Sequence, residues 1–345
     1  MKKPFFSIII ANYNNELYLD KAIKSVLNQS FSDFELIIID DGSTDNSRKV
    51  IRKYKKNDCI KIIFKGNSGV SDTRNIGINN SNGYWISFLD SDDWLDIDAL
   101  YNTYSLIKQN HNLQLVVSNL QLISNDNKFI ENKLYDNMMT GLLKNEERYE
   151  LLNSIVSINY YGVKKNNGKY GNCRCIGGKF YKSDIIKKNN IYFPTNIKMF
   201  EDGIFNLYYL MSIKYAYFTS KKDYYYRQVY SSTTHTKNID SNSQVTTIIL
   251  ELEKFYNKYE IMNKVPLIYS VSDLIYYSIS KIAEQNNITK MNTCVKQIKY
   301  LNDNFKNYII EFCNLNKYVS FKSKILFFLF KYKMYYLIYL ALKLR

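Results

Sequence analysis

Three carboxylates lie within four consecutive residues, Asp90-Ser91-Asp92-Asp93, directly after the apolar run 84–89. An apolar run of this length is typical of a buried parallel strand. Carboxylates this close together repel one another unless they face water or hold a hard cation through their oxygens. Because ligands of open α/β sheets bind at the carboxyl ends of strands, the turn is a candidate metal–diphosphate site. The alternative is a solvated acidic turn in which Asp93 caps a helix that starts at Leu95.

The first 115 residues or so alternate apolar runs with segments of helical periodicity. We expect strands over 5–11, 34–39, 60–64, 84–89 and 113–118, and helices over 17–29, 43–55, 69–79 and 95–109. The helix that ends near Lys55 would be capped by Ser43 or Thr44. Such alternation predicts an α/β fold with a mostly parallel sheet, whose right-handed crossovers bring the strand C-termini to one edge.

The rest of the chain is less regular up to residue 240 and then reads as helices over 245–259, 265–285 and 291–314. No Gly/Ser/Pro linker interrupts it, so a flexible hinge between domains is not expected. We therefore expect an α/β domain over 1–240, with halves 1–118 and 119–240, and a helical C-terminal region over 241–345.

The composition points to an anionic partner. The 345 residues include 47 Lys and Arg and 32 Asp and Glu, which gives a net charge of +15. Such a charge suits nucleic acid, a phosphate-rich substrate or a membrane surface. The five cysteines lack zinc-site spacing, which favours free thiols in a reducing cytosol. Neither a signal peptide nor an uncharged run of 18 apolar residues occurs, so no transmembrane helix is expected.

Several nucleotide and hydrolase signatures are absent. The chain has no Gly-x-Gly-x-x-Gly after the first strand, no P-loop and no Gly-x-Ser-x-Gly elbow, and it has only two histidines. What remains is a set of acidic turns and one arginine, Arg74, that could hold a nucleotide diphosphate through a cation.

Five segments, in the same order and at similar spacing, resemble family 2 glycosyltransferases with the GT-A fold. They are 7–14 (SIIIANYN), 25–29 (SVLNQ), 40–45 (DDGSTD), 69–75 (GVSDTRN) and 88–93 (FLDSDD). The resemblance continues through 179–181, 200–202 and 226–227 and covers about two-thirds of the chain. It implies a GT-A domain over 1–240, with a nucleotide-sugar half and an acceptor half, and an inverting transfer from a nucleotide-diphosphate sugar.

The resemblance also assigns roles at the donor end. Ala11 and Tyr13 would line the nucleobase, and Asp41 would accept a hydrogen bond from it, which favours uracil. Asn67 and Arg74 would bound the nucleotide pocket.

Two acidic residues would meet the rest of the donor: Asp90 the ribose, and Asp92 a Mg²⁺ or Mn²⁺ ion on the diphosphate. Two positions depart from the family pattern, since Ala11 replaces a usual proline and Asp72 stands where a small residue is usual.

The same resemblance makes Asp202 the base that deprotonates the acceptor hydroxyl, with Glu201 in support. The alternative is that both residues only cap a helix that starts near Gly203. Arg227 would clamp the diphosphate or form a surface ion pair. His235 would be a metal ligand or a surface loop residue, and Lys179 would lie beside the acceptor.

The C-terminal segment 317–345 is basic and aromatic, and no acidic residue follows Glu311. Its lysines recur too often for a membrane span, so it reads as an amphipathic helix on an anionic leaflet. The alternative is a helix that packs on the catalytic domain or on a second subunit. A homo-oligomer is therefore a second possible explanation of this segment. The expected location is cytoplasmic, peripheral on the inner face of the membrane, with a lipid-linked glycan as acceptor.

Two hypotheses of different classes follow. The first is a metal-dependent glycosyltransferase that builds a cell-surface glycan from a UDP-sugar. The second is a catalytically silent sugar-nucleotide-binding or scaffold protein of a glycan assembly complex. A nucleic-acid binder is not expected, because the positive charge is concentrated in the tail and no known nucleic-acid module occurs.

Overall fold

The computed structural model describes residues 3–131, 137–156, 169–171, 173–228, 241–285, 291–315 and 328–338. The chain forms two compact units, which we call unit 1 (residues 1–155 and 166–232) and unit 2 (156–165 and 233–345). The second half of the expected α/β domain shares a single sheet with the first half.

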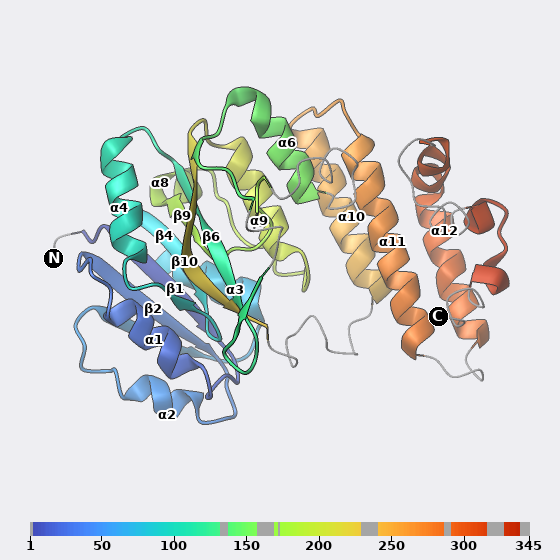
Figure 1. The fold of residues 1–345 in the computed structure, drawn as a ribbon. Helices are drawn as coiled ribbons and strands as arrows, with labels where there is room; N and C mark the ends of the chain where they lie inside the picture. The colour runs from blue at the N-terminus through green and yellow to red at the C-terminus, as the bar shows by residue number, and fades with distance from the viewer. Residues whose placement is uncertain are drawn as a thin grey trace. The chain divides into compact units, whose positions relative to one another are not determined.

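In the described part of unit 1, one sheet runs in the order β3-β2-β1-β4-β9-β6-β10-β5, with β7 beside β6 and β8 beside β10 (Figure 1). Its strands are β1 (Phe6–Asn12), β2 (Phe34–Asp41), β3 (Ile60–Lys65), β4 (Trp85–Asp90), β5 (Trp94–Leu95), β6 (Leu115–Ile123), β7 (Phe129–Ile130), β8 (Gly141–Leu142), β9 (Lys179–Lys182) and β10 (Ala216–Arg227).

The first four strands are parallel, and β1 lies between β2 and β4. The chain therefore winds outward through β2 and β3 and then returns to the other side of β1. In α/β proteins, ligands bind at the carboxyl ends of the strands where the strand order reverses, which here are the ends of β1 and β4. Strand β9 is antiparallel to both β4 and β6, and β10 runs parallel to β6.

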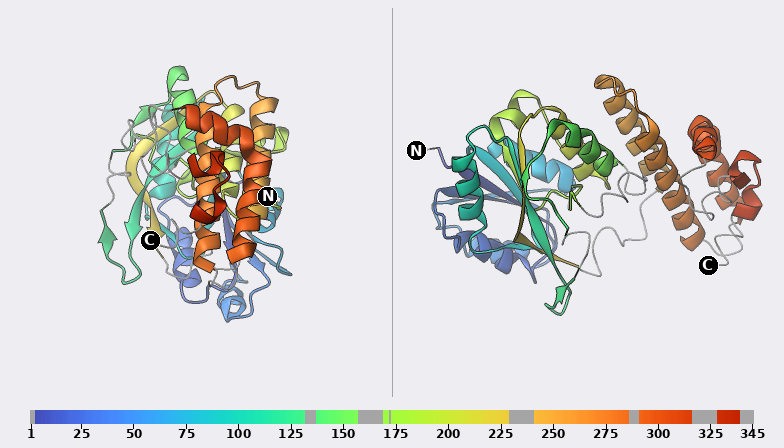
Figure 2. Two further views of the ribbon diagram at one scale, coloured as in Figure 1. Left: turned by 90° about the vertical axis from the view of Figure 1, so that its right-hand side faces the viewer. Right: turned by 45° about the horizontal axis from the view of Figure 1, so that its top comes forward.

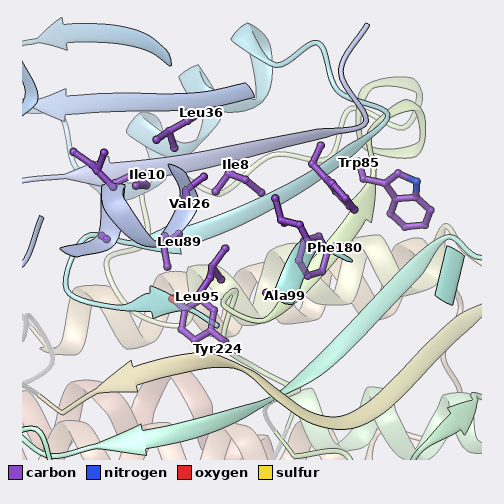
Figure 3. Close-up of a cluster of buried hydrophobic side chains, with 14 of the residues drawn as sticks. Ile8, Ile10, Val26, Leu36, Trp85, Leu89, Leu95, Ala99, Phe180 and Tyr224 are labelled. Atoms are coloured by element: carbon purple, nitrogen blue, oxygen red, sulfur yellow. The ribbon is translucent and has the colours of Figure 1, made fainter. Parts of the chain in front are cut away.

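Helices cover both faces of the sheet. Helices α1 (Leu19–Leu27), α2 (Ser47–Arg52) and α4 (Ala99–Gln109) pack with one set of alternating strand side chains, including Ile8 and Ile10, in a buried cluster (Figure 3). Helices α3 (Val70–Asn80) and α9 (Glu201–Met211) cover the opposite set. There Phe205 stacks on Phe193, with ring centroids 4.2 Å apart, and packs edge-on against Phe88. Two further helices of unit 1 are α6 (Asn145–Val156) and α8 (Ser183–Lys188).

Two local expectations are wrong. Leu95 does not start a helix, because it is buried in β5 beside Tyr224 of β10, and α4 begins at Ala99. Neither Ser43 nor Thr44 caps α2, which begins at Ser47, where the Ser47 amide donates to the Asp45 carboxylate at 2.9 Å. The Ser43 hydroxyl instead accepts from the Asn12 side chain and the Asn14 amide, so in both cases a tertiary contact overrides the local signal.

Unit 2 is helical in its described residues, with α10 (Ser241–Lys258), α11 (Val265–Gln285) and α12 (Met291–Asn314). Helix α11 packs against both α10 and α12 (Figure 2). In the described segment 328–338, Phe330 and Ile338 are buried, and the Tyr335 hydroxyl accepts from the Asn302 amide at 2.9 Å. Of the helices so described, none combines the length and the apolar character that a membrane crossing requires.

Candidate active site

The turn after β4 is built into the sheet. Asp93 is 2% exposed, and its carboxylate accepts from the Tyr224 hydroxyl at 2.7 Å and from the Arg227 amide at 2.8 Å. Burial raises the pKa of Asp93 well above its usual range. The alternative of a solvated turn with Asp93 as a helix cap is therefore wrong. Asp93 instead ties the turn to β10, which leaves Asp90 and Asp92 as the carboxylates that can meet a ligand.

Arg74 on α3 joins three carboxylates from distant parts of the chain. Its guanidinium donates to Asp90 at 2.9 Å, to Asp202 at 2.8 Å and to Glu201 at 3.3 Å. The arginine is only 5% exposed, so it is a buried cation whose charge is met by carboxylates on two elements. The structure thus brings the end of β4 and the start of α9 together around Arg74.

The start of α9 holds Asp202 from both sides. Phe200 precedes the helix in a left-handed conformation, with φ at 68°, and such a backbone persists only where the surroundings impose it. A Cβ at Gly203 would lie 2.5 Å from the Phe200 ring, so only glycine fits there. One Asp202 oxygen accepts from Arg74 and the other from the Ile176 amide at 3.1 Å. Glu201 and Asp202 occupy the first helical turn, and Phe200 is the N-cap.

Asp202 has the electrostatics of a general base near neutral pH. Burial raises its pKa to about 7, the charges of Glu201 and Asp90 add to the rise, and the Arg74 cation opposes it. Its side chain still keeps 22% of its surface exposed, so a substrate hydroxyl can reach it. A carboxylate with a pKa near the working pH accepts a proton efficiently.

Asp92 is the carboxylate of the turn that fits a cation. Burial and the neighbouring charge of Asp90 raise its pKa to about 6. No side chain of the described residues hydrogen bonds to its carboxylate, in contrast to Asp90 and Asp93. Mg²⁺ is commonly held by one or two carboxylates together with phosphate oxygens and waters, so a single such residue suits Mg²⁺ or Mn²⁺. Over the described ranges, no group of three or more His, Cys, Asp or Glu is placed to hold a metal by itself. His235 lies outside the described residues.

The three residues assigned to the nucleobase, Ala11, Tyr13 and Asp41, lie at the ends of β1 and β2. Asn67, which was assigned to the bounds of the nucleotide pocket, follows the end of β3. Ala11 is in β1, and the Tyr13 ring that follows is half exposed. A Cβ at Gly42 would lie 2.6 Å from the Asn67 nitrogen, so the loop after β2 touches the loop after β3. This contact brings Asn67 beside Asp41 at the sheet edge.

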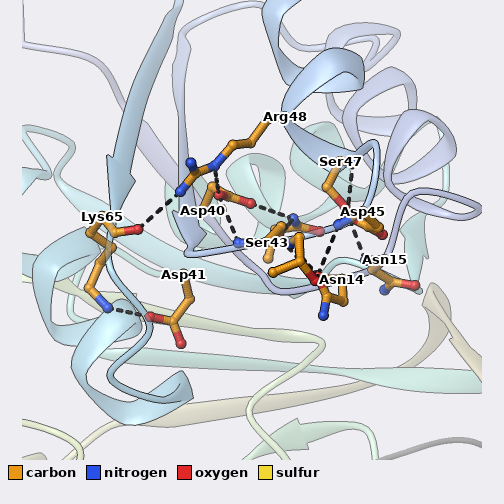
Figure 4. A network of polar contacts seen from close by, with 11 residues as sticks. Asn14, Asn15, Asp40, Asp41, Ser43, Asp45, Ser47, Arg48 and Lys65 are labelled. Carbon is orange, nitrogen blue, oxygen red and sulfur yellow. Dashed lines mark hydrogen bonds and ion pairs between the residues drawn. The ribbon is translucent and has the colours of Figure 1, made fainter.

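Asp41 is buried and serves as an acceptor for several donors at once. Its carboxylate pairs with the Lys65 ammonium and accepts from the Ser68 amide at 2.8 Å and the Gly69 amide at 2.9 Å. Figure 4 shows Lys65 and Asp41 facing one another, while the neighbouring Asp40 turns to Arg48. Asp41 therefore holds the start of α3 in place.

Arg227 lies at the end of β10 and contacts the acidic turn. Its guanidinium donates to the Asp92 carbonyl at 3.2 Å and to the Asn127 side chain at 2.9 Å. It also lies over the rings of Tyr18 and Trp94, 4.6 and 4.9 Å from their centroids. The arginine is 5% exposed, so it does not form a surface ion pair. Its contact with the Asp92 carbonyl instead supports the acidic turn.

Lys179 in β9 is 3% exposed, and its ammonium donates to the Cys175 carbonyl. Burial lowers its pKa. The contact with Cys175 places Lys179 against the loop whose Ile176 amide donates to Asp202. A role of Lys179 beside the acceptor stays a prediction. The described cysteines, 59, 173, 175 and 313, are free thiols.

Three contributors to the site were not found from the sequence. The first is Tyr224, whose hydroxyl anchors Asp93. The Ile176 amide carries no side-chain signal. Lys65 could have been found, because it follows an apolar strand at the same sheet edge as the acidic turns.

Comparison with known proteins places this geometry in context. A profile of the family described as Glycosyl transferase family 2 matches residues 7–175. The poly(ribitol-phosphate) beta-N-acetylglucosaminyltransferase TarP of Staphylococcus aureus is 30% identical over 262 residues, 74% of this chain and 72% of TarP. The minor teichoic acid biosynthesis protein GgaA of Bacillus subtilis is 33% identical over 230 residues, 65% of this chain and 47% of GgaA. The chain spans less than half the length of the first curated relatives it matches.

The fold also matches a solved structure. Residues 1–349 of S. aureus TarS, crystallised with UDP-GlcNAc, superpose with a TM-score of 0.70 at 18% identity, over 98% of this chain and 90% of that one. At this identity the likeness concerns the fold alone. It confirms the α/β GT-A architecture with C-terminal helices that the sequence predicts.

Proposed function

The chain belongs to glycosyltransferase family 2, and on that premise we propose that it is an inverting glycosyltransferase that moves a sugar from a UDP-sugar to a hydroxyl of a cell-surface glycan. The observation that carries the proposal is the Arg74 cluster, which joins Asp90 of the strand-end turn to Asp202, a partly exposed carboxylate whose pKa is raised to about 7. A silent binding protein would need no base beside its donor site.

The donor end supports a uridine nucleotide. Asp41 at the end of β2 offers an acceptor, and the half-exposed Tyr13 ring after β1 offers a stacking surface. Two relatives, TarS and TarP, are named N-acetylglucosaminyltransferases, and TarS was crystallised with UDP-GlcNAc. UDP-GlcNAc is therefore the first donor to test. Arg227, which contacts the backbone of the acidic turn, would keep the diphosphate side of the site in a fixed conformation.

The proposed reaction displaces the diphosphate from the donor sugar, and the charged residues of the site assist the proton transfer and the departure of the leaving group. The acceptor oxygen attacks the anomeric carbon, the bond to the diphosphate breaks and its electron pair leaves with the diphosphate, while Asp202 takes the hydroxyl proton. Arg74 keeps Asp202 oriented, and the Glu201 charge helps to keep its pKa high. A Mg²⁺ or Mn²⁺ ion bound by Asp92 would neutralise the charge that develops on the leaving diphosphate.

Unit 2 carries the side chains that support a membrane-bound acceptor. In the segment 328–338, Phe328, Tyr332 and Tyr336 are each at least half exposed, beside the exposed Lys331 and Lys333. Exposed aromatic rings among lysines suit the interface of an anionic membrane. We propose that this face holds the enzyme at the membrane, where a lipid-linked glycan would be the acceptor.

The test is a screen of UDP-sugars for Mn²⁺-dependent release of UDP, with membrane lipid extract as acceptor. Asp202→Asn should abolish transfer and leave UDP binding nearly intact, because Asn cannot take the proton. Asp184→Asn is the matched control, since Asp184 is an exposed aspartate in the first turn of α8. Near-full turnover by Asp202→Asn would remove Asp202 from the mechanism. A wild-type protein that binds UDP but never releases it from any sugar would be the silent binder.

A further inference from the structure

Lys65 lies at the centre of a charged network that the proposed reaction does not use. Its ammonium pairs with the Asp41 carboxylate and lies 3.3 Å from the Asp72 carboxylate. It also contacts the Ser68 hydroxyl, and it lies 3.4 Å from the Thr73 hydroxyl. The lysine side chain is 14% exposed and that of Asp41 is 5% exposed. An ammonium has three donors, and these contacts occupy all of them.

The oxygens of Asp41 can be counted in the same way. One oxygen takes Lys65 and the Ser68 amide, and the other takes the Gly69 amide. A carboxylate has about four lone-pair sites, so one acceptor site remains on the second oxygen. No other donor from the described residues contacts that oxygen. The network thus leaves one acceptor site on an oxygen whose position Lys65 and two backbone amides fix.

Asp72 is the unusual member of the network. Its carboxylate accepts from the Ser68 hydroxyl and from Lys65, and these contacts lower its pKa. Without Lys65, the negative charges of Asp41 and Asp72 would face one another across a partly buried space. Lys65 therefore offsets the repulsion between the two carboxylates, and Asp72 in turn keeps Lys65 directed toward Asp41.

We propose that Lys65, oriented by Asp72, is a positioning residue that presents the remaining Asp41 acceptor to the ring N–H of uracil and so selects uracil over cytosine. The inference rests on the proposed function, in which Asp41 faces the nucleobase. The uracil ring carries a hydrogen at N3, whereas N3 of cytosine is an acceptor and would meet the carboxylate lone pair. A buried acceptor left without its donor makes such discrimination large.

The experiment measures the dissociation constants of UDP and CDP, each titrated alone, for the wild type and for Lys65→Met. The wild type should prefer UDP, and Lys65→Met should lower this preference about tenfold, the effect of one charge-assisted hydrogen bond. Lys61→Met is the matched control, because Lys61 is exposed on the same strand, and it should keep the full preference.

If the Lys65→Met protein does not fold, a second pair of variants at Asp72 tests the same inference. Asp72→Ala should lower the UDP preference, and Asp72→Asn, which keeps an acceptor for Lys65 and Ser68, should restore most of it. Affinities for UDP and CDP that fall equally would show a merely structural role and overturn the inference. An unchanged preference in both Lys65→Met and Asp72→Ala would overturn it as well. A wild-type protein that binds neither nucleotide would instead contradict the proposed function.

Discussion

At the scale of single residues, the site depends on one buried cation among three acids. Arg74 meets Asp90, Glu201 and Asp202, so the cluster carries a net negative charge beside the position proposed for the acceptor. This imbalance, together with burial, keeps the pKa of Asp202 near neutrality. A full set of counter-cations would instead hold that pKa low and make a weak base.

The raised pKa predicts a pH profile. We expect kcat/KM to rise with pH through about 7 and then to level off, because Asp202 must be ionised to accept the proton. An aspartate with its ordinary pKa would give a flat profile over about pH 5 to 8. The measurement is initial rate at low donor concentration across this range.

The Glu201→Gln variant tests the origin of that profile. Removing the Glu201 charge should move the midpoint to lower pH, since this charge helps to raise the pKa of Asp202. A midpoint that stays in place, or that moves upward, would contradict the electrostatic account.

At the scale of elements, helix α3 contacts both ends of the proposed donor site. Its first turn contacts the loop that Asp41 holds, and Arg74 reaches the acidic turn from its middle. The helix lies close against β1 because Gly77 has no side chain: a Cβ there would lie 2.4 Å from the Ile9 methyl. The distance between α3 and the sheet therefore sets the position of Arg74.

This contact predicts the effect of Gly77→Ala. Alanine favours a helix by about 1 kcal/mol over glycine, but the clash with Ile9 should outweigh this gain and destabilise the protein by about 1–3 kcal/mol. Urea unfolding measures the change. Gly66→Ala is the control, because no atom lies within 4 Å of a Cβ at that position. Equal stability of the two variants would show that α3 shifts freely, and then Arg74 is not fixed by this packing.

At the scale of the whole molecule, the described end of unit 2 separates a buried face from an exposed one. Phe330, Tyr335 and Ile338 pack inward, so deleting the tail would damage the helical unit as well as any membrane contact. Charge reversal on the exposed face is the cleaner change, because it spares the buried side chains.

We therefore expect the double variant Lys331→Glu, Lys333→Glu to bind vesicles that contain anionic lipid about tenfold or more weakly than the wild type. Co-sedimentation with such vesicles, at low and high salt, is the measurement. Lys254→Glu with Lys264→Glu is the control, since both lysines are exposed elsewhere in unit 2. Equal loss in both variants would reflect net charge alone, and no loss in either would contradict a membrane role for this face.

Much of the nucleotide-sugar half was determined by the sequence alone. The first four strands begin within one residue of their predicted starts, because apolar runs and turn residues are local signals. The acidic turn after β4 and the family motifs likewise depend only on residue order. Later segments gave weaker signals, and the short strand β9, which enters the sheet between β4 and β6, was not predicted.

Only the tertiary structure decided which charges meet. Arg74 and Asp202 are 128 positions apart, and no periodicity connects them; the packing of α3 and α9 on the same face of the sheet does. The pairing of β10 with β5 likewise brings Tyr224 to Asp93, and the register of β2 with β3 places Lys65 beside Asp41. Local patterns select elements, but the partner of a buried charge is whichever group the folded chain places beside it, since burial leaves no water to take that role.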